Sequence, residues 1–501
     1  MRRPPLAPIA TAVLVGVALG VAGCAEQPSR ATPEPIATRL PVFAVAPTAT
    51  EEATPVPELA DGEVAQLLEE LVCWYDDPSL AEECLPVGPE EAELLGEIAE
   101  RGDRRFIAPL VDMLWLDVGW ERWVTEALTA ITGEEFADAY GWSSWIGVER
   151  PPLPDGYTGW KGRLISLVDE RFVELLPPDL LLAVRPDELI WTRVAMDERV
   201  PLVDPPTVHN VEERYLAASD VVFGVLVGGE ARAYPQRIVA WHELVTDEVG
   251  GQSLVIAHCV PCGGIAVYSG VASDGTRYTF GNSGLVYRSR QVYYDAETNS
   301  LWDQLSGKAI AGEAMRNGVS LNPTMVVRTT WGEWSARHPN TRVLSLDTGA
   351  VRNYDEGAAL TEEASSTGPL YPAPVGADAS VDPKTLVLAV TVSGVTRAYP
   401  LATIEAIGVV HDRIAGQDIA LVSRGPGLGV SVYFEEGITI DRIEGPRDAL
   451  EVVDSEGIHW FLDEERLTNV IDSTTRRAIP TRVAYWFAWA DAYPETTLWG
   501  S

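Results

Sequence analysis

The chain has 501 residues, of which 74 are acidic and 37 are basic, so its net charge is −37. Nucleic-acid binding and adhesion to anionic lipid both require clustered positive charge, and this balance argues against both. The length allows two or three domains, and the excess of acidic residues is explained by a solvated surface.

The first 24 residues have the pattern of an export signal. Residues 1–3 carry the positive charge, an apolar run covers residues 9–23, and small residues lead directly into Cys24. This run is shorter than the roughly 20 predominantly apolar residues of a membrane-spanning helix, and it is typical of a secretory signal at residues 1–23. Its end resembles a lipobox, so we predict an extracytoplasmic protein anchored to the cell membrane by a lipid on Cys24. The alternative is an ordinary signal peptide with a chance cysteine.

Two segments follow with different compositions. Residues 24–57 are rich in Pro, Thr, Ala and Glu and are predicted to be a disordered tether, because they cannot bury enough apolar surface to fold. In residues 58–177 apolar residues recur at helical spacing. These helices resemble HEAT-type repeats, and a small helical cap is the alternative. Outside the cytoplasm, Cys73 and Cys84 are predicted to form a local disulfide.

Beyond this helical region the pattern changes to short β-like runs. Residues 221–227 and 253–257 are examples, and glycine pairs and polar turns separate such runs. One helix is predicted from Pro235 to about Glu248, with the proline in its first turn.

Two parts of the β-rich region are alike at a constant offset. Residues 222–235 read VFGVLVGGEARAYP and residues 387–400 read VLAVTVSGVTRAYP, which is an offset of 165 positions. The same offset still pairs Tyr268 with Tyr433. A constant register across helix-like and strand-like stretches indicates an internal duplication.

The prediction for the whole chain is an α+β fold in which a HEAT-like helical region precedes two tandem, related, β-rich modules. The expected boundaries are 58–177 for the helical region, 178–355 for the first copy, 356–383 for a linker and 384–501 for the second copy.

The polar residues best suited to chemistry occur in the first copy alone. His242, Glu243, His258, Cys259 and Cys262 fall opposite Ile407, Gly408, Ser423, Arg424 and Gly427. If the second copy folds without thiols, the thiols of the first copy are separable from the fold and available for function. The alternative is that drift removed a dispensable disulfide from the second copy.

Three interpretations of the Cys259-x-x-Cys262 pair stay open. As a metal site, the two thiolates would bind copper or zinc together with His258 or His242. As a redox site, the pair would lack the helix that usually follows such a motif, because a turn and a β-like run come next. As a structural disulfide, it would close a small ring and add little loop entropy. In that case the chain is a non-enzymatic binding or scaffold module, and its helical region is a surface for a protein partner.

A pocket is also expected in the first copy, although no reaction follows from it. The run FGNSGLVYRS at residues 280–289 could present backbone N–H groups to an anion beside Arg288, or form a glycine-rich hairpin turn. Asp295 and Asp303 could serve as acid and base, or cap turns. The predicted pocket residues are Glu243, Ser283, Arg288, Asp295, Trp302 and Gln304.

A series of short motifs runs through the β-rich region. They are RAYP at 232–235, WHE at 241–243, HCVPC at 258–262, FGNSGLVYRS at 280–289, YYD at 293–295, SLWDQ at 300–304 and YWFAWADAYPETTLW at 485–499. Together these motifs resemble the bacterial domain-of-unknown-function family DUF3179, over residues 178–499. His258 stands where the family usually has an aromatic residue, and Pro261 is displaced by one position within the motif. The resemblance implies an architecture and no established activity, substrate or cofactor.

Overall fold

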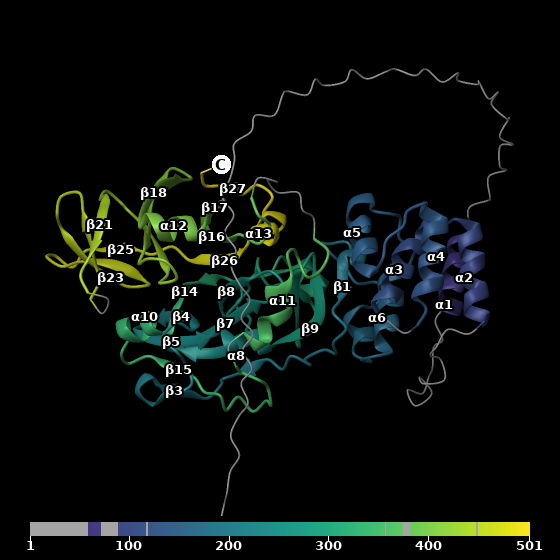
Figure 1. The fold of residues 1–501 in the computed structure, drawn as a ribbon, viewed down its shortest axis with the longest axis horizontal. Helices are drawn as coiled ribbons and strands as arrows, with labels where there is room; N and C mark the ends of the chain where they lie inside the picture. Colours follow the sequence, from purple (N-terminus) through teal and green to yellow (C-terminus); the bar gives the residue numbers. More distant parts are fainter. Residues whose placement is uncertain are drawn as a thin grey trace, which may run out of the picture. The chain divides into compact units, whose positions relative to one another are not determined.

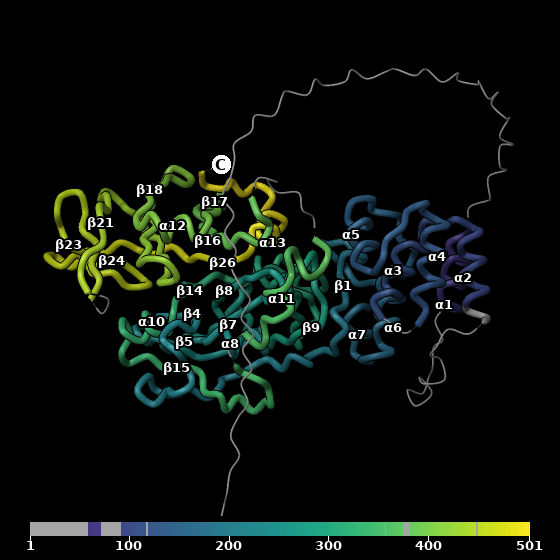
Figure 2. Tube along the Cα trace, viewed as in Figure 1, coloured from purple at the N-terminus to yellow at the C-terminus, as the bar shows by residue number. Residues whose placement is uncertain are grey.

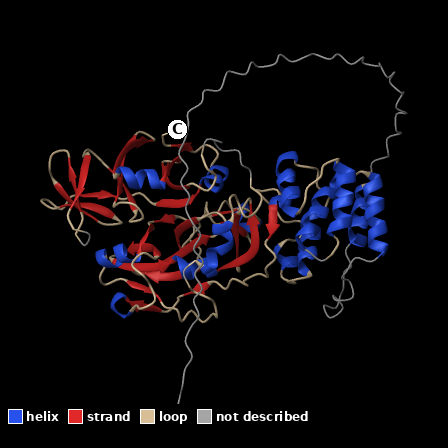
Figure 3. Ribbon diagram, viewed as in Figure 1, coloured by secondary structure: helices blue, strands red, loops and turns tan. Residues whose placement is uncertain are grey.

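A computed structural model describes residues 59–71, 89–116, 119–355, 357–373, 381–446 and 449–500 (Figure 1). Helices come first along the chain, and strands with short helices follow (Figure 3), which confirms the predicted α+β class. The predicted signal, the tether, Cys24, Cys73 and Cys84 lie outside the described residues. Within those ranges, no helix is long and apolar enough to cross a membrane.

The N-terminal helices share one apolar core. The described ones are α1 (Asp61–Leu71), α2 (Pro89–Arg101), α3 (Ile107–Leu116), α4 (Glu121–Thr132), α5 (Ala139–Glu149), α6 (Tyr157–Ser166) and α7 (Phe172–Leu175). Helix α3 is apolar on almost every side, and it is accordingly buried against three neighbouring helices, α4, α5 and α6. Gly133 ends α4 with a φ of 77°, as glycine after a helix commonly does. The similarity to HEAT repeats stays a prediction.

The first β-rich half runs from strand β4 to strand β15. Its main elements are β4 (Val221–Val227), β5 (Glu230–Pro235), α8 (Gln236–His242), β6 (Leu244–Val249), β7 (Gln252–Cys259), β8 (Gly264–Ser269), β9 (Phe280–Tyr287), β10 (Arg290–Asp295), β11 (Leu301–Asp303), β12 (Lys308–Ala309), β14 (Val327–Thr330), α10 (Trp331–Arg337) and β15 (Arg342–Leu344). Three short strands precede them, β1 (Leu189–Trp191), β2 (Leu202–Val203) and β3 (Thr207–His209).

The second half has a similar order of elements. They are β16 (Leu386–Val392), β17 (Val395–Pro400), α12 (Leu401–Ile407), β18 (Val409–Ile414), β19 (Gln417–Ser423), β20 (Val430–Phe434), β21 (Ile440–Glu444), β22 (Glu451–Asp454), β23 (His459–Leu462), β24 (Arg466–Asn469), β25 (Thr475–Arg477), β26 (Thr481–Tyr485), α13 (Trp486–Ala492) and β27 (Thr497–Leu498). In both halves a helix of seven residues follows the second strand.

The strand pairing is also similar in the two halves. In the first, β14, β4, β5 and β15 are neighbours and β15 runs parallel to β5; in the second, β26, β16, β17 and β27 are neighbours and β27 runs parallel to β17. Strand β8 pairs with β26 through Ile265 and Val483, so one sheet contains strands of both halves (Figure 2). Apolar side chains of both halves form one core, because this sheet continues across them.

The halves also share one buried polar arrangement. In each, a tyrosine hydroxyl and an arginine guanidinium on one strand donate to the carboxylate of an aspartate on a nearby strand, over distances of 2.6 to 2.8 Å. The residues are Tyr234, Arg232 and Asp247 in the first half, and Tyr399, Arg397 and Asp412 in the second.

One local prediction was wrong. The helix expected from Pro235 to about Glu248 ends at His242, because Glu243 has a positive φ and strand β6 begins at the next residue.

Candidate functional site

Cys259 and Cys262 form a disulfide at the turn between strands β7 and β8. Both side chains have 0% of their surface exposed. The turn closes with a hydrogen bond from the Gly263 N–H to the Val260 carbonyl at 3.2 Å, and β8 then begins at Gly264. A strand therefore follows the motif, as the sequence predicted, so the cysteines do not lie in the first turn of a helix.

A few polar groups approach the two sulfurs within a mainly apolar cluster. The Cys262 N–H donates to Cys259 Sγ at 3.2 Å, and the Ser289 carbonyl oxygen lies 3.9 Å from that sulfur. Gln304 Nε2 donates to the Ala257 carbonyl at 2.6 Å, which orients Gln304 Oε1 to 3.8 Å from Cys262 Sγ. Each sulfur of the bonded pair therefore already has a partner that would suit a thiol or a thiolate.

His258, the residue before the first cysteine, faces the apolar core. Its ring packs against Phe223 at a centroid distance of 5.1 Å, and its Nδ1 lies 2.7 Å from the Gly264 carbonyl oxygen. Only an Nδ1–H can bond that oxygen, so Nε2 is the unprotonated nitrogen, and it has no partner among the described residues. Burial lowers the pKa of His258 to about 4, which keeps the ring neutral at pH 7.

His242, the other histidine predicted for a metal, is occupied at both ring nitrogens. Nδ1 lies 2.6 Å from the Val200 carbonyl oxygen and Nε2 lies 2.6 Å from the Tyr354 hydroxyl. Burial lowers the pKa of this histidine. In the described part of the chain, no three side chains of His, Cys, Asp or Glu are grouped so as to hold a metal ion.

Glu243 has a fully buried side chain on a strained backbone. Its φ is 61°, a region that side chains disfavour sterically. Its N–H donates to the Val239 carbonyl at 2.6 Å, and its own carbonyl accepts the His258 N–H at 2.7 Å, so backbone bonds on both sides maintain this conformation.

The carboxyl group of Glu243 is only half paired. Oε1 accepts from Arg199 Nη1, whereas Oε2 is buried without a partner among the described residues. Burial raises the pKa of Glu243, and the charge of Arg199 opposes that effect. Strained backbone and incompletely paired buried carboxyls are both typical of functional sites.

A small pocket lies between the cysteine turn and strands β9 and β10. Its volume is about 10 Å³, which is room for about one water molecule. Asn282 lies in one wall of the pocket, and its side chain is held in place because Nδ2 donates to the Arg199 and His242 carbonyls. Its Oδ1 has no partner in the described structure. The lining residues that matter for chemistry are Arg199, Pro261, Asn282, Gln291 and Tyr371.

Three of these lining residues were missed by sequence reasoning. Arg199 precedes the β-rich run, and Tyr371 lies in the segment predicted to be a linker, so neither has a motif beside it. Gln291 alone has a local signal, as a polar amide at the start of the β-like run QVYYD.

The other residues predicted for the pocket have local structural contacts. Ser283 Oγ donates to the Val292 carbonyl at 2.6 Å within the β9–β10 hairpin. Asp295 accepts the indole N–H of Trp302 at 2.8 Å and the backbone N–H of Thr298 at 2.6 Å. Its carboxylate therefore caps a turn, which was the alternative to a role as acid or base. None of these side chains is among those that line the pocket described above.

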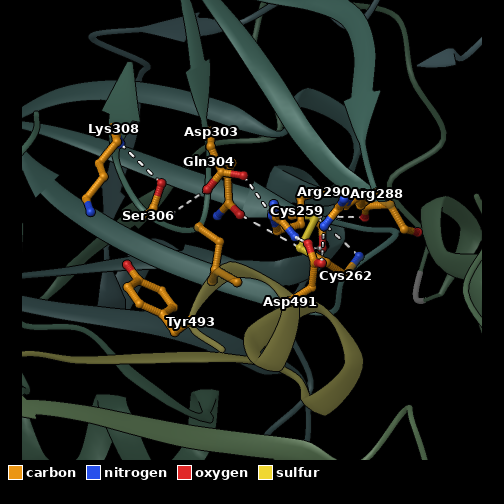
Figure 4. A network of polar contacts seen from close by, with 12 residues as sticks. Cys259, Cys262, Arg288, Arg290, Asp303, Gln304, Ser306, Lys308, Asp491 and Tyr493 are labelled. Atoms are coloured by element: carbon orange, nitrogen blue, oxygen red, sulfur yellow. Dashed lines mark hydrogen bonds and ion pairs between the residues drawn. A yellow bond between two sulfur atoms is a disulfide. The ribbon is translucent and has the colours of Figure 1, made fainter. Parts of the chain in front are cut away.

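Arg288 belongs to an ionic network next to the cysteine pair (Figure 4). It pairs with Glu188 and with Asp491 of helix α13, at 2.7 Å each. Arg290 pairs with Asp491 and, at 2.7 Å, with Asp303. Asp491 therefore joins the second half to the hairpin that contacts Cys259.

Comparison with known proteins gives one match. The family described as "Protein of unknown function (DUF3179)" matches residues 197–496, a range that includes the cysteine pair and every pocket residue named above. No curated protein and no solved structure matches. Because the matched range covers more than half of the chain, this protein belongs to the DUF3179 family.

Proposed function

We propose that this chain is a membrane-anchored extracytoplasmic lipoprotein whose first half carries a reversible redox pair, Cys259 and Cys262. The observation that carries the proposal is the bonded pair itself, in contacts that also suit its reduced form. The Cys262 N–H would stabilise a thiolate on Cys259, because a hydrogen bond to the charged form favours it. A thiol on Cys262 would find acceptors in the Cys259 carbonyl and in Gln304 Oε1, each 3.8 Å from its sulfur.

Similarity between the halves supports a role for the pair beyond holding the fold together. We infer that the halves arose by duplication, because strand order, the parallel pairings and the Tyr–Arg–Asp arrangement recur. In the second half, Arg424 and Gly427 stand at the positions of the two cysteines. A similar frame is thus built without a disulfide, so the first half does not need one to fold.

The proposed location rests on the N-terminal sequence. The charged start, the short apolar run and Cys24 support export and lipidation. An oxidising compartment is also where a reversible disulfide is chemically useful. The helical region is the surface that we propose for any protein partner.

Redox titration tests the proposal. The purified protein is equilibrated in dithiothreitol buffers of graded potential, free thiols are alkylated, and the reduced fraction is read by mass spectrometry. We expect a midpoint potential above about −300 mV. Structural disulfides typically have midpoint potentials below that value, so they resist reduction. Circular dichroism should show the reduced protein still folded. A pair that reduces only on unfolding would establish the structural alternative, in which the chain is a binding or scaffold module.

Metal binding by the reduced pair is a second candidate, which rests on the Cys-x-x-Cys spacing and on the unpartnered Nε2 of His258. The side chains would have to rearrange to form it, because in the described structure no three of them are grouped to hold a metal ion. Copper or zinc would suit two thiolates and an imidazole. His242 suits the role less, because both of its nitrogens are already engaged. Protein reduced and dialysed against each metal should then hold one equivalent by elemental analysis, and Cys259→Ser should abolish it. Metal contents equal to those of the variant would exclude this candidate.

A further inference from the structure

An oxidant that reacts with the proposed redox pair while the turn stays closed must be small. Both sulfurs are fully buried, so a thiol or disulfide of another folded protein cannot reach them without opening the turn. The pocket lined by Pro261, which lies between the two cysteines in the chain, has room for about one water molecule. A molecule of only a few atoms can enter.

Three polar groups at this pocket have no hydrogen-bond partner among the described residues. Asn282, 2% exposed, has only its Oδ1 acceptor free, because its Nδ2 is engaged by two carbonyls. Gln291 is 5% exposed and its side-chain amide makes no hydrogen bond to described residues, nor does the hydroxyl of Tyr371. The pocket thus offers acceptors and donors to one small molecule.

The charges at the pocket favour an uncharged molecule. The guanidinium of Arg199 is paired with the carboxyl of Glu243, so an anion would compete with that carboxyl for it. Dioxygen is small and neutral but donates no hydrogen bond, and Asn282 Oδ1 requires a donor. A hydroperoxide is small, neutral at pH 7, and both donates and accepts hydrogen bonds.

Neither cysteine is among the residues that line the pocket, but Ser289 links the pocket wall to one sulfur in particular. The Tyr371 N–H donates to Ser289 Oγ at 3.3 Å, and the Ser289 carbonyl oxygen is 3.9 Å from Cys259 Sγ. That sulfur also accepts the Cys262 N–H, the contact that would stabilise a thiolate. Cys259 is therefore the expected nucleophile, and Cys262 the expected resolving residue.

We propose that this pocket binds hydrogen peroxide, the smallest hydroperoxide, and that Cys259 is oxidised by it when the side chain, released from the disulfide by reduction, turns toward the pocket; this rests on the proposed redox function. The Cys259 thiolate attacks one peroxide oxygen, the O–O bond breaks, and the leaving hydroxide takes up a proton to form water. Cys259 is then a sulfenic acid. The Cys262 sulfur attacks it, the S–S bond forms, and the departing hydroxide takes the thiol proton as a second water. Two electrons pass from the sulfurs to the peroxide.

The test measures disulfide formation in pre-reduced, full-length protein. Stopped-flow mixing with hydrogen peroxide is followed by alkylation and mass spectrometry. Diamide, which is too large for the pocket and reacts when the turn opens, serves as an oxidant that needs no pocket. We expect the peroxide reaction to be on the order of a hundredfold faster than that of dithiothreitol at the same pH, as oriented donors can provide. Closure by diamide with a peroxide rate no faster than that of dithiothreitol would overturn the peroxide site and leave the redox pair standing. Closure by neither oxidant would overturn both.

Matched variants distinguish pocket chemistry from general damage. Gln291→Leu and Tyr371→Phe should each slow the peroxide reaction about tenfold, the effect of losing one hydrogen bond in the transition state, and leave the diamide rate unchanged. Tyr140→Phe is the control. The Tyr140 hydroxyl donates to the carbonyl of Pro369, two residues before Tyr371, but Tyr140 does not line the pocket. Equal peroxide rates in all three variants would contradict the site.

Trapping identifies the attacking sulfur. In Cys262→Ser, a sulfenic acid on Cys259 has no resolving thiol, so dimedone should label Cys259 after peroxide treatment. In Cys259→Ser, Cys262 should stay unlabelled. A label on Cys262 with Cys259 unreactive would overturn the assignment of Cys259 as the nucleophile.

Discussion

Glu243 and Gly408 occupy corresponding places at the ends of the short helices α8 and α12, and both have a positive φ, 61° and 95°. The carbonyl of each accepts a strand N–H at 2.7 Å, from His258 and Ser423 respectively. The backbone frame thus requires a positive φ at this place. Glycine meets that requirement at little steric cost, whereas a residue with a Cβ costs about 1–2 kcal/mol. The glutamate is present in spite of the strain, and its carboxyl group pairs with Arg199.

Substitutions at these two positions should separate the strain from the carboxyl. Glu243→Gly and Glu243→Ala both remove the carboxyl, so the difference between them reports the backbone alone. We expect Glu243→Gly to be more stable by about 1 kcal/mol. Gly408→Ala should lose a similar amount, because no atom lies within 4 Å of a Cβ built there and strain is the main cost. Urea unfolding measures all three, and equal stability of the two Glu243 variants would refute the strain.

Replacing both cysteines should leave the protein folded. The bridge spans a sequence separation of 3, so the loop it closes is short and the chain-entropy contribution is about 2 kcal/mol. The variant Cys259→Ser with Cys262→Ser should keep the circular dichroism spectrum of the parent and unfold at a lower urea concentration. An insoluble or unfolded double variant would show that the first half does depend on its disulfide.

The stability of the protein should fall as the pH decreases from about 6.5 to about 4. Burial depresses the pKa of His258 from its ordinary 6.5 to about 4, so in this window the unfolded chain binds a proton that the folded protein does not. Stability is therefore lost on acidification, by up to about 3 kcal/mol from this residue.

The variant His258→Asn isolates that contribution, because the asparagine amide can still donate to the Gly264 carbonyl. At each pH, the unfolding free energy of the variant is subtracted from that of the parent. This difference should fall as the pH is lowered from 6.5 to 4. A flat difference would show that the buried ring is protonated as readily as a free one.

Asp491 should contribute strongly to stability, because it pairs across the halves with the buried guanidinium of Arg290 and the partly buried one of Arg288. Asp491→Asn removes the negative charge from Arg288 and Arg290 while keeping the size of the side chain. We expect a loss of about 3 kcal/mol in the free energy of unfolding. Glu126→Gln is the matched control: its partner Arg122 lies on an exposed helix surface, and the loss there should stay below about 0.5 kcal/mol. Similar losses in both variants would mean that the buried network is not special.

Patterns along the chain predicted the local elements well where backbone preferences decide them. Strand β4 has the bounds of the predicted run at residues 221–227, and the expected strand after the cysteine turn is present. The helix after Pro235 was predicted too long, because the helical pattern continues into residues that form strand β6 in the structure. A positive φ at a glutamate has no signature in one sequence, although the glycine opposite it in the second half was a hint.

What the sequence by itself determined is therefore the family, the strands and turns, and the position of the cysteine pair, since these depend on residues close together in the chain. The tertiary structure alone decided that Arg199 and Tyr371 meet Pro261 and Gln291 at one pocket, and that Asp491 reaches the Arg288 hairpin. The reason is physical: those contacts join segments far apart in the chain. The pocket residues meet through the folding of the first half and the segment that follows it, whereas Asp491 reaches Arg288 because the two halves pack around a shared sheet.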